Sequence, residues 1–155
     1  MGPMEAAAAG MESAAKNYLD DLEAMSEAQI LESAGGTARS AVDFTFETAI
    51  INKRIAARLN GVEPPAMPEG EGWTVAPEEL RSKSAIAEYM KSACDELIAV
   101  AKTKSEEAGA QLMPLFGGEK PTFYAVNFAA MHTMYHCAQL NFIQSLAGDM
   151  EVHWG

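Results

Sequence analysis

The segment that decides the fold is PTFYAVNFAAMHTMYHCAQLNFIQSLAG, residues 121–148, which contains no Asp, Glu, Lys or Arg. Large apolar side chains, from Phe123 to Ile143, occur on every side of the helix that it would form. Such a helix is central, spans a membrane or is covered by a partner. The polar residues that interrupt the run too often for a membrane span are Asn127, His132, His136, Gln139, Asn141 and Gln144. Because a small helical domain cannot bury one helix on every side, we expect a homodimer with this helix near the interface.

Helical patterns also cover most of the chain before this segment. The predicted helices span residues 11–25, 26–34, 37–60 and 77–104. Ser26 and Gln29 form a capping box for the short second helix, Thr37 caps the third helix and Pro77 opens the fourth. Together with the last segment, these helices predict an all-α fold, a four-helix bundle, as a single domain over residues 1–155. We expect residues 1–10 to be flexible or foreign to this domain.

Two segments break the helical pattern. Residues 61–76, GVEPPAMPEGEGWTVA, contain too many prolines and glycines for a helix, so we predict a loop. Its Trp73 either covers the mouth of a pocket or belongs to an ordinary solvent-exposed loop, and the second alternative is the more common one. Residues 109–120, GAQLMPLFGGEK, interrupt the pattern again, and no alternation long enough for a core strand occurs.

Composition excludes several classes of partner. The chain of 155 residues is 48% apolar, and its 11 basic and 22 acidic residues give a formal net charge of -11. Nucleic acids and anionic membranes repel such a protein, so we expect neither as a partner. Two cysteines, Cys94 and Cys137, are too few for a disulfide framework, and no basic and apolar leader begins the chain. We therefore expect a cytoplasmic protein with free thiols.

The last helix contains a pair of histidines with the spacing of metal ligands. His132 and His136 are four residues apart, so their imidazoles project from one face of the helix about one turn apart. Two neutral imidazoles at this spacing can bind one divalent ion, with zinc and nickel the first candidates. The alternative is a pair of core or interface histidines that hydrogen-bond to their neighbours. Gln139, on the same side, either fixes the tautomer of His136 or is a buried amide. His153 lies beyond this helix and is expected to pack at the surface.

A two-histidine site needs a further protein ligand, and the helix predicted at 37–60 offers two carboxylates. Asp43 and Glu47 are four residues apart, and Arg39 is placed to pair with Asp43. Glu47 has no cation three or four residues away, and a carboxylate among apolar side chains usually serves a metal, an arginine or a histidine across the fold. Alternatively, Glu47 lies at the edge of its helix and is solvated. Helix rotation decides between the two acids, and the sequence does not specify it.

These two segments resemble a known family. Residues 132–149, HTMYHCAQLNFIQSLAGD, are similar to the last-helix signature of the DinB/YfiT-like superfamily, in which His, three residues, His, two residues and Gln precede an apolar stretch to Gly. Residues 38–61, ARSAVDFTFETAIINKRIAARLNG, resemble the second helix of that superfamily. The resemblance extends over roughly residues 11–148. It implies a four-helix bundle that is commonly dimeric and holds a divalent metal with three histidines.

Two of those histidines fall on His132 and His136, but the third, from the second helix, is missing, because no histidine precedes residue 132. Asp43 or Glu47 would have to replace it, and if neither reaches the histidines the site is degenerate. The resemblance implies a metal-dependent transferase or hydrolase for a small molecule that uses a low-molecular-weight thiol. Further contacts to the metal site or the substrate would come from Gln139, Tyr135, Asn127 and Arg54. Cys137 is expected to be a packing residue. The alternative is a non-catalytic helical dimer with a stress-related or small-molecule-binding role.

Overall fold

The structure is a computed structural model that describes residues 1–155, and it is mainly helical, which confirms the all-α expectation in its general form. Its helices and strands, in chain order, are α1 (Pro3–Ala24), α2 (Glu27–Leu31), α3 (Ala41–Leu59), the 3-10 helix η1 (Glu78–Leu80), α4 (Lys83–Lys102), α5 (Glu106–Ala110), β1 (Leu112–Leu115), β2 (Gly118–Pro121) and α6 (Thr122–Leu146). No helix combines the length and the apolar character that crossing a membrane requires.

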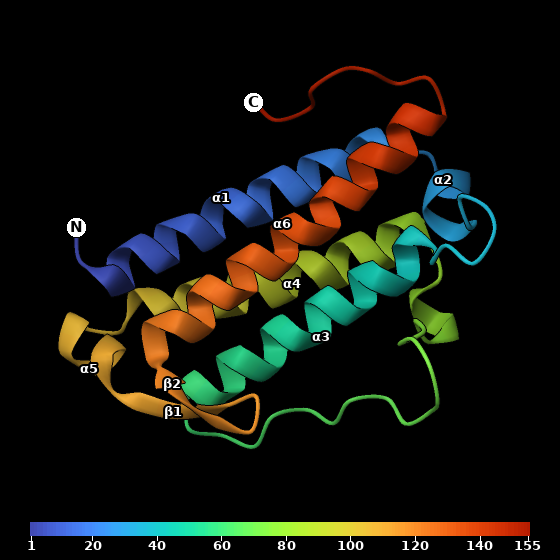
Figure 1. Ribbon diagram of the computed structural model, residues 1–155. Coiled ribbons are helices and arrows are strands. Elements are labelled where there is room, and N and C mark those ends of the chain that lie inside the picture. The colour runs from blue at the N-terminus through green and yellow to red at the C-terminus, as the bar shows by residue number, and fades with distance from the viewer.

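Four long helices lie side by side and enclose the core (Figure 1). Each of them packs against two others, in the pairs α1–α6, α6–α3, α3–α4 and α4–α1. Helices α3 and α4 run in the same direction, opposite to α1 and α6, and residues 60–82 return along the length of the molecule between them (Figure 1). This long connection allows α3 and α4 to pack as a parallel pair. The other neighbour of α3 is α6, which runs antiparallel to it.

The first residues of the chain are packed into the fold, so the expectation of a flexible start is wrong. Helix α1 begins at Pro3, and the side chains of Met4, Ala7 and Ala8 are buried in the hydrophobic core. The carboxylate of Glu106 accepts hydrogen bonds of 2.9 Å from the backbone N–H groups of Met4 and Glu5. This contact satisfies donors that a helix N-terminus otherwise leaves unpaired, and it fixes the start of α1.

Several helix boundaries differ from the sequence expectations. The capping box of Ser26 and Gln29 is present, as predicted. The third helix begins at Ala41 after Ser40, so Thr37 is not its cap. Pro77 opens only the 3-10 turn η1, and α4 starts after Ser82, whose hydroxyl accepts a hydrogen bond from the N–H of Ala85. A side-chain cap at Ser82 marks the start of α4, whereas Ser40 makes no side-chain cap at the start of α3 and its hydroxyl donates to Asp43 instead.

The second break in the helical pattern folds as a two-stranded hairpin. Strands β1 and β2 are antiparallel, with Leu115 opposite Gly118. The two residues between them, Phe116 and Gly117, both have positive φ angles, 51° and 72°. A two-residue hairpin turn of type I′ has a positive φ at both positions. The ring of Phe116 contacts Phe128 of α6 edge-on at 4.5 Å, which ties the hairpin to the last helix.

Both cysteines are free and buried, and we expect them to be unreactive in the native protein. Burial raises the pKa of the Cys94 thiol to about 12. Burial also raises the pKa of Cys137, and the neighbouring Asp21 carboxylate, which accepts its hydrogen bond, adds to this shift. Because the thiolate is the reactive form, an aromatic disulfide reagent at pH 7.5 should modify native protein at least roughly 100-fold more slowly than urea-denatured protein. Rapid modification of one thiol before unfolding would contradict this expectation.

Candidate metal centre

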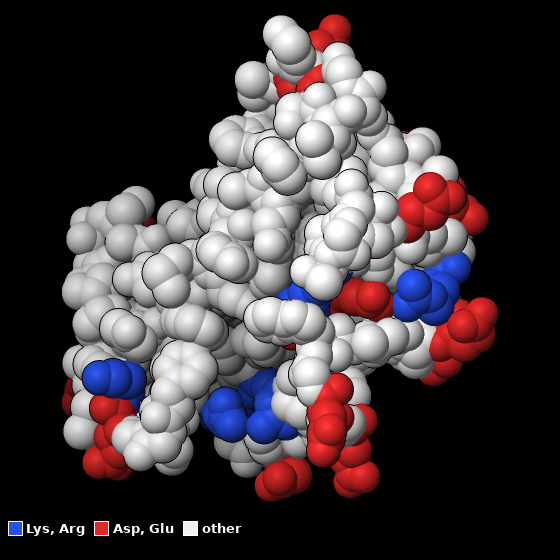
Figure 2. All heavy atoms as spheres, turned by 45° about the vertical axis from the view of Figure 1, so that its right-hand side comes forward, with Lys and Arg blue, Asp and Glu red and all other residues white.

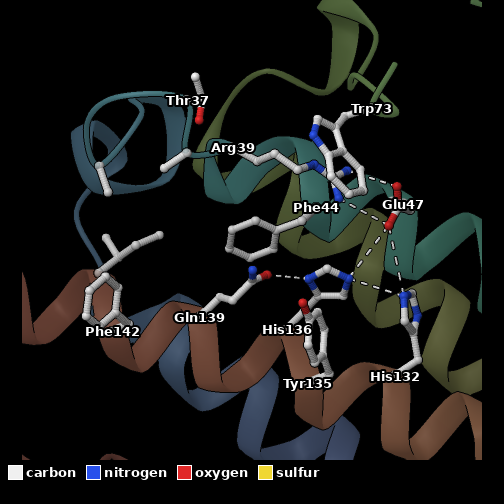
Figure 3. Close-up of a pocket in the computed structure, with 13 residues that line it drawn as sticks. Thr37, Arg39, Phe44, Glu47, Trp73, His132, Tyr135, His136, Gln139 and Phe142 are labelled. Atoms are coloured by element: carbon white, nitrogen blue, oxygen red, sulfur yellow. Dashed lines mark hydrogen bonds and ion pairs between the residues drawn. The ribbon is translucent and has the colours of Figure 1, made fainter. Parts of the chain in front are cut away.

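The structure brings Glu47 of α3 together with His132 and His136 of α6. The Nε2 atoms of the two histidines are 3.2 Å apart. Glu47 Oε1 lies 3.7 Å from the Nε2 atom of His136 and 4.0 Å from that of His132. In Figure 3 the carboxylate projects from α3 toward both imidazoles, which project from consecutive turns of α6. Three potential ligand atoms from two antiparallel helices therefore meet at one point.

Neighbouring side chains hold each imidazole in place. The ring of His136 stacks on that of Phe44, with 5.2 Å between the ring centroids. Its Nδ1 atom is 2.6 Å from Gln139 Oε1. Because the amide oxygen accepts, Nδ1 carries the proton and Nε2 presents its lone pair toward Glu47 and His132. His132 stacks on Phe128 at 5.7 Å, while its Nδ1 atom is buried without a hydrogen-bond partner. Packing and the 3.2 Å contact between the two Nε2 atoms therefore orient His132, whereas His136 is also held by its hydrogen bond to Gln139.

Both imidazoles are neutral near pH 7. Burial and, to a smaller extent, the neighbouring His136 lower the pKa of His132 to about 4, although the charge of Glu47 opposes this shift. Burial also lowers the pKa of His136, although the hydrogen bond to Gln139 and the charge of Glu47 partly offset this effect. Neutral imidazole is the form that binds metal ions, so the site does not need to lose protons from histidine before it binds one.

Glu47 also pairs with an arginine that lies outside its helix. Arg39 donates two hydrogen bonds to the carboxylate, of 3.2 and 2.9 Å, and a third to the carbonyl oxygen of Thr74. Burial alone would raise the pKa of Glu47, but the hydrogen bond and the charge of Arg39 outweigh it, so the pKa is lowered. The expected pairing of Arg39 with Asp43 is wrong. Arg39 precedes the start of α3, so helical spacing does not restrict its side chain, which reaches Glu47 instead.

Asp43 does not belong to the histidine cluster. Its carboxylate binds the hydroxyl of Ser40, the N–H of Ala76 and the guanidinium of Arg81, at 2.7, 2.9 and 2.8 Å. These contacts attach the end of the loop at residues 61–76 to the first turn of α3. The structure therefore assigns Asp43 a structural position, and of the two acids only Glu47 faces the histidines.

The contacts of Asp43 predict a pH-dependent contribution to stability. Burial alone would raise the pKa of Asp43, but the hydrogen bonds from Ala76, Ser40 and Arg81 lower it. A carboxyl whose pKa is lower in the folded state stabilises the protein above the pKa of the unfolded state, and this contribution disappears as the pH falls through the folded-state value. We expect Asp43→Asn to lower the free energy of unfolding by about 1–3 kcal/mol at pH 7 and by clearly less at pH 3. Urea denaturation at both pH values measures this difference, and equal losses would contradict it.

The cluster lies at one end of a pocket of about 610 Å³. The pocket is lined by Ala34, Thr37, Ala38, Arg39, Phe44, Glu47, Trp73, His132, Tyr135, His136, Gln139, Phe142 and Ile143. Trp73 is 71% exposed and its ring contacts the guanidinium of Arg39 at 4.9 Å, so the loop at residues 61–76 does border the pocket. Phe44 and Phe142 were not predicted from the sequence to line the pocket. Their spacing of three residues from Glu47 and from Gln139, respectively, is the signal that could have indicated them.

The remaining predicted contacts divide into two groups. Gln139 and Tyr135 line the pocket, and the ring of Tyr135 meets that of His136 edge-on at 5.0 Å. Asn127 is exposed in a separate surface hollow of α6, and Arg54 donates a hydrogen bond to the carbonyl oxygen of Pro65. Neither of these two residues reaches the cluster, so the expectation that they contact it is wrong. His153 pairs with Asp149 near the C-terminus, as a surface residue would.

The donor set fits a divalent ion. Three ligands that bind one zinc ion at 2.0–2.2 Å in tetrahedral geometry lie about 3.3–3.6 Å from one another. The observed separations of 3.2, 3.7 and 4.0 Å reach this range with small side-chain movements. Three protein ligands are also the number found at catalytic zinc sites, which keep one position open, whereas structural sites supply four.

The fold and the site together define a mainly helical protein with a Glu-His-His cluster at one end of a pocket. Comparison with protein-family models and with curated proteins finds no match. Among solved structures, a conserved protein from Enterococcus faecalis superposes on this chain with a TM-score of 0.72 and 15% sequence identity. The match covers 94% of this chain and 97% of that protein. At this identity the similarity concerns the fold alone.

Proposed function

We propose that this protein is a divalent-metal-dependent protein of the DinB/YfiT-like type, with zinc or nickel held by Glu47, His132 and His136. The convergence of one carboxylate and two neutral imidazoles beside a pocket supports this proposal most strongly. The reaction would be a transfer or a hydrolysis on a small molecule, with a low-molecular-weight thiol as cosubstrate. A divalent ion bound there lowers the pKa of a coordinated water or thiol and so supplies a nucleophile near neutral pH.

The residues around the donors have distinct tasks in this proposal. Gln139 Oε1 accepts a hydrogen bond from His136 Nδ1 and so keeps the Nε2 lone pair pointed into the site. Arg39 holds the carboxylate of Glu47 through two hydrogen bonds and fixes the direction of Oε1. Phe44 and Tyr135 enclose the ring of His136 and limit the access of water to it. The site is thus preorganised by contacts that exist before any ligand enters.

Metal analysis of protein purified without a polyhistidine tag tests the proposal. After dialysis against zinc or nickel and removal of free ion, we expect close to one bound ion per chain in the native protein. The His136→Ala variant should bind much less than one. Stoichiometric metal that survives this substitution, or a native protein that retains none, would overturn the proposal. Circular dichroism of both proteins shows whether the variant has kept its helices.

One observation favours a second, non-catalytic function. The charge of Glu47 is already neutralised by Arg39, so the carboxylate is stable in its position without an ion. In that case Glu47, His132 and His136 form a partly buried polar network of a degenerate site, and the pocket serves in small-molecule binding, for example under stress. The metal analysis separates the two functions, because a network of this kind has no stoichiometric ion to lose.

We also propose that the chain forms a homodimer through an exposed face of α6. Large apolar residues along this face are 43% to 63% exposed, and they are Tyr124, Met131, Tyr135, Phe142 and Leu146. Figure 2 shows uncharged side chains over much of one side of the molecule, with charged ones mainly along its lower and right-hand edges. Because the chain carries a net charge of -11, two copies repel each other least where they meet through a helix without ionised groups. Tyr135 and Phe142 also line the pocket, so the second copy would border it.

A charge placed on this face should separate the two copies. We expect light scattering to give a dimer mass for native protein at micromolar concentration and a monomer mass for Met131→Glu, because an acidic group would be buried at the interface without a partner. Met131 lies outside the pocket, so metal content should be unchanged in this variant. Leu112→Glu, an exposed apolar position on β1, is the control that should remain dimeric. A monomeric native protein would contradict the expectation.

A further inference from the structure

The two ends of the pocket differ in chemistry. All of its ionisable groups lie at the end formed by Arg39, Glu47, His132 and His136, whereas Phe142 and Thr37 lie away from them in Figure 3. The other lining residues are uncharged. A ligand that fills the pocket therefore meets charged groups at one end only, and apolar side chains both beside that end, at Trp73 and Tyr135, and at Phe142.

The charge of the polar end depends on the proposed ion. Histidines that bind a metal are neutral, and the charges of Arg39 and Glu47 cancel each other in their bidentate pair. A divalent ion held by these residues therefore leaves about two positive charges, because the pocket has no acidic residue other than Glu47. The pocket then attracts anions, although the protein as a whole carries a charge of -11.

Aromatic rings form much of the apolar wall. Trp73, Tyr135 and Phe142 line the pocket and are 71%, 62% and 63% exposed in the single chain, so a ligand that covers the parts of their rings facing the pocket removes apolar area from water. The contact of Arg39 with the ring of Trp73 keeps the indole over the end of the pocket that holds Glu47 (Figure 3). Flat rings stack favourably on such walls. A volume of about 610 Å³ accommodates a molecule of one or two rings.

We propose that the pocket binds a small aromatic anion, whose acidic oxygen or sulfur donor faces Glu47, His132 and His136 and whose ring lies against Trp73, Tyr135 and Phe142. This inference rests on the proposed function, because the ion supplies the positive charge. It names the class of substrate for that site: a carboxylate, thiolate or hydroxamate attached to a flat apolar body. Aliphatic anions lack the ring contact, and aromatic cations are repelled.

Calorimetric titration of protein loaded with zinc, whose metal content is measured first, tests the inference with three probes. Benzohydroxamate carries both the acidic donor group and the ring, acetohydroxamate carries only the donor group, and benzylamine is an aromatic cation. We expect benzohydroxamate to bind at least about tenfold more tightly than acetohydroxamate, and benzylamine to show no binding. In Phe142→Ala the ratio of the two hydroxamate affinities should fall to less than about threefold, while the affinity for acetohydroxamate stays unchanged. In Leu112→Ala, a substitution outside the pocket, the ratio should remain at the native value.

The outcomes distinguish this inference from the proposed function. If zinc binds stoichiometrically but the two hydroxamates bind equally, or benzylamine binds as well as benzohydroxamate, the inference is wrong and the metal site stands. If no zinc binds, both are wrong. Benzohydroxamate should also raise the affinity of the protein for zinc. The factor should equal the one by which zinc raises the affinity for benzohydroxamate, because the coupling is reciprocal. If benzohydroxamate binds equally well to zinc-loaded protein and to protein stripped of metal by a chelator, the ion is not the source of the attraction for anions.

Discussion

The Glu47→Gln variant is expected to bind zinc or nickel roughly 100-fold more weakly than the native protein, because loss of a direct ligand costs at least as much as loss of the partners that orient ligands. Glutamine keeps the size of the side chain and an oxygen that can accept a hydrogen bond from Arg39. It replaces a negatively charged oxygen ligand with a neutral amide oxygen, which attracts a divalent ion less strongly. Metal competition with a coloured chelator at pH 7.5 measures the affinity of both proteins.

Asp43→Asn is the matched control for this experiment. Asp43 is an acid on the same helix, one turn from Glu47, and it also pairs with an arginine. Its carboxylate contacts the loop at residues 61–76 and not the histidines. Metal affinity should therefore stay within about threefold of the native value in this variant, even though its stability falls. Equal losses in both variants would show that the effect comes from general destabilisation, and no loss in Glu47→Gln would remove Glu47 from the site.

The Asp21→Ala variant is expected to lose about 3 kcal/mol of free energy of unfolding, the largest stability effect that we predict. Asp21 of α1 is fully buried, and its Oδ2 atom accepts three hydrogen bonds. The donors are Cys137 Sγ at 3.2 Å, Asn141 Nδ2 at 2.7 Å and Trp154 Nε1 at 2.8 Å. Alanine removes the acceptor of all three donors, leaves the buried Cys137 thiol without a partner, and breaks the hydrogen bond that holds Trp154 to α1.

Two further variants separate the hydrogen bonds of Asp21 from its other effects. Asp21→Asn keeps an oxygen at the position of Oδ2 and should lose less than half as much stability as Asp21→Ala. Asp20→Ala removes the neighbouring acid, whose partner is the exposed Lys16, and should change the free energy of unfolding by less than about 0.5 kcal/mol. Urea denaturation of the four proteins, followed by circular dichroism, measures these differences. Equal losses for Asp21→Ala and Asp21→Asn would show that the three hydrogen bonds contribute little.

The sequence predicted the helical class because that information is local. Apolar residues at helical spacing, the capping box at Ser26 and the prolines and glycines of residues 61–76 each involve only neighbours in the chain. Boundaries were less predictable: Ser40 and Ser82, rather than Thr37 and Pro77, precede the long helices. Several capping residues compete near each end, and contacts elsewhere in the fold decide among them.

The candidate site shows the same division. The spacing of His132, His136 and Gln139 along one helix determined that their side chains share a face, and the structure shows them together. The choice between Asp43 and Glu47 depended on the rotation of α3 against α6, and the partner of Glu47 was an arginine eight residues away, outside any helical spacing rule.

The amino-acid sequence by itself determined the helical segments, the uncharged character of α6 and the pairing of two histidines on one face, because each follows from residues close together in the chain. Only the tertiary structure decided which acid meets the histidines, that Arg39 neutralises it, and that Trp73 borders the pocket. These contacts join segments that are far apart in sequence. Their geometry depends on how whole helices pack and on the path of the long connection between α3 and α4, which no local pattern specifies.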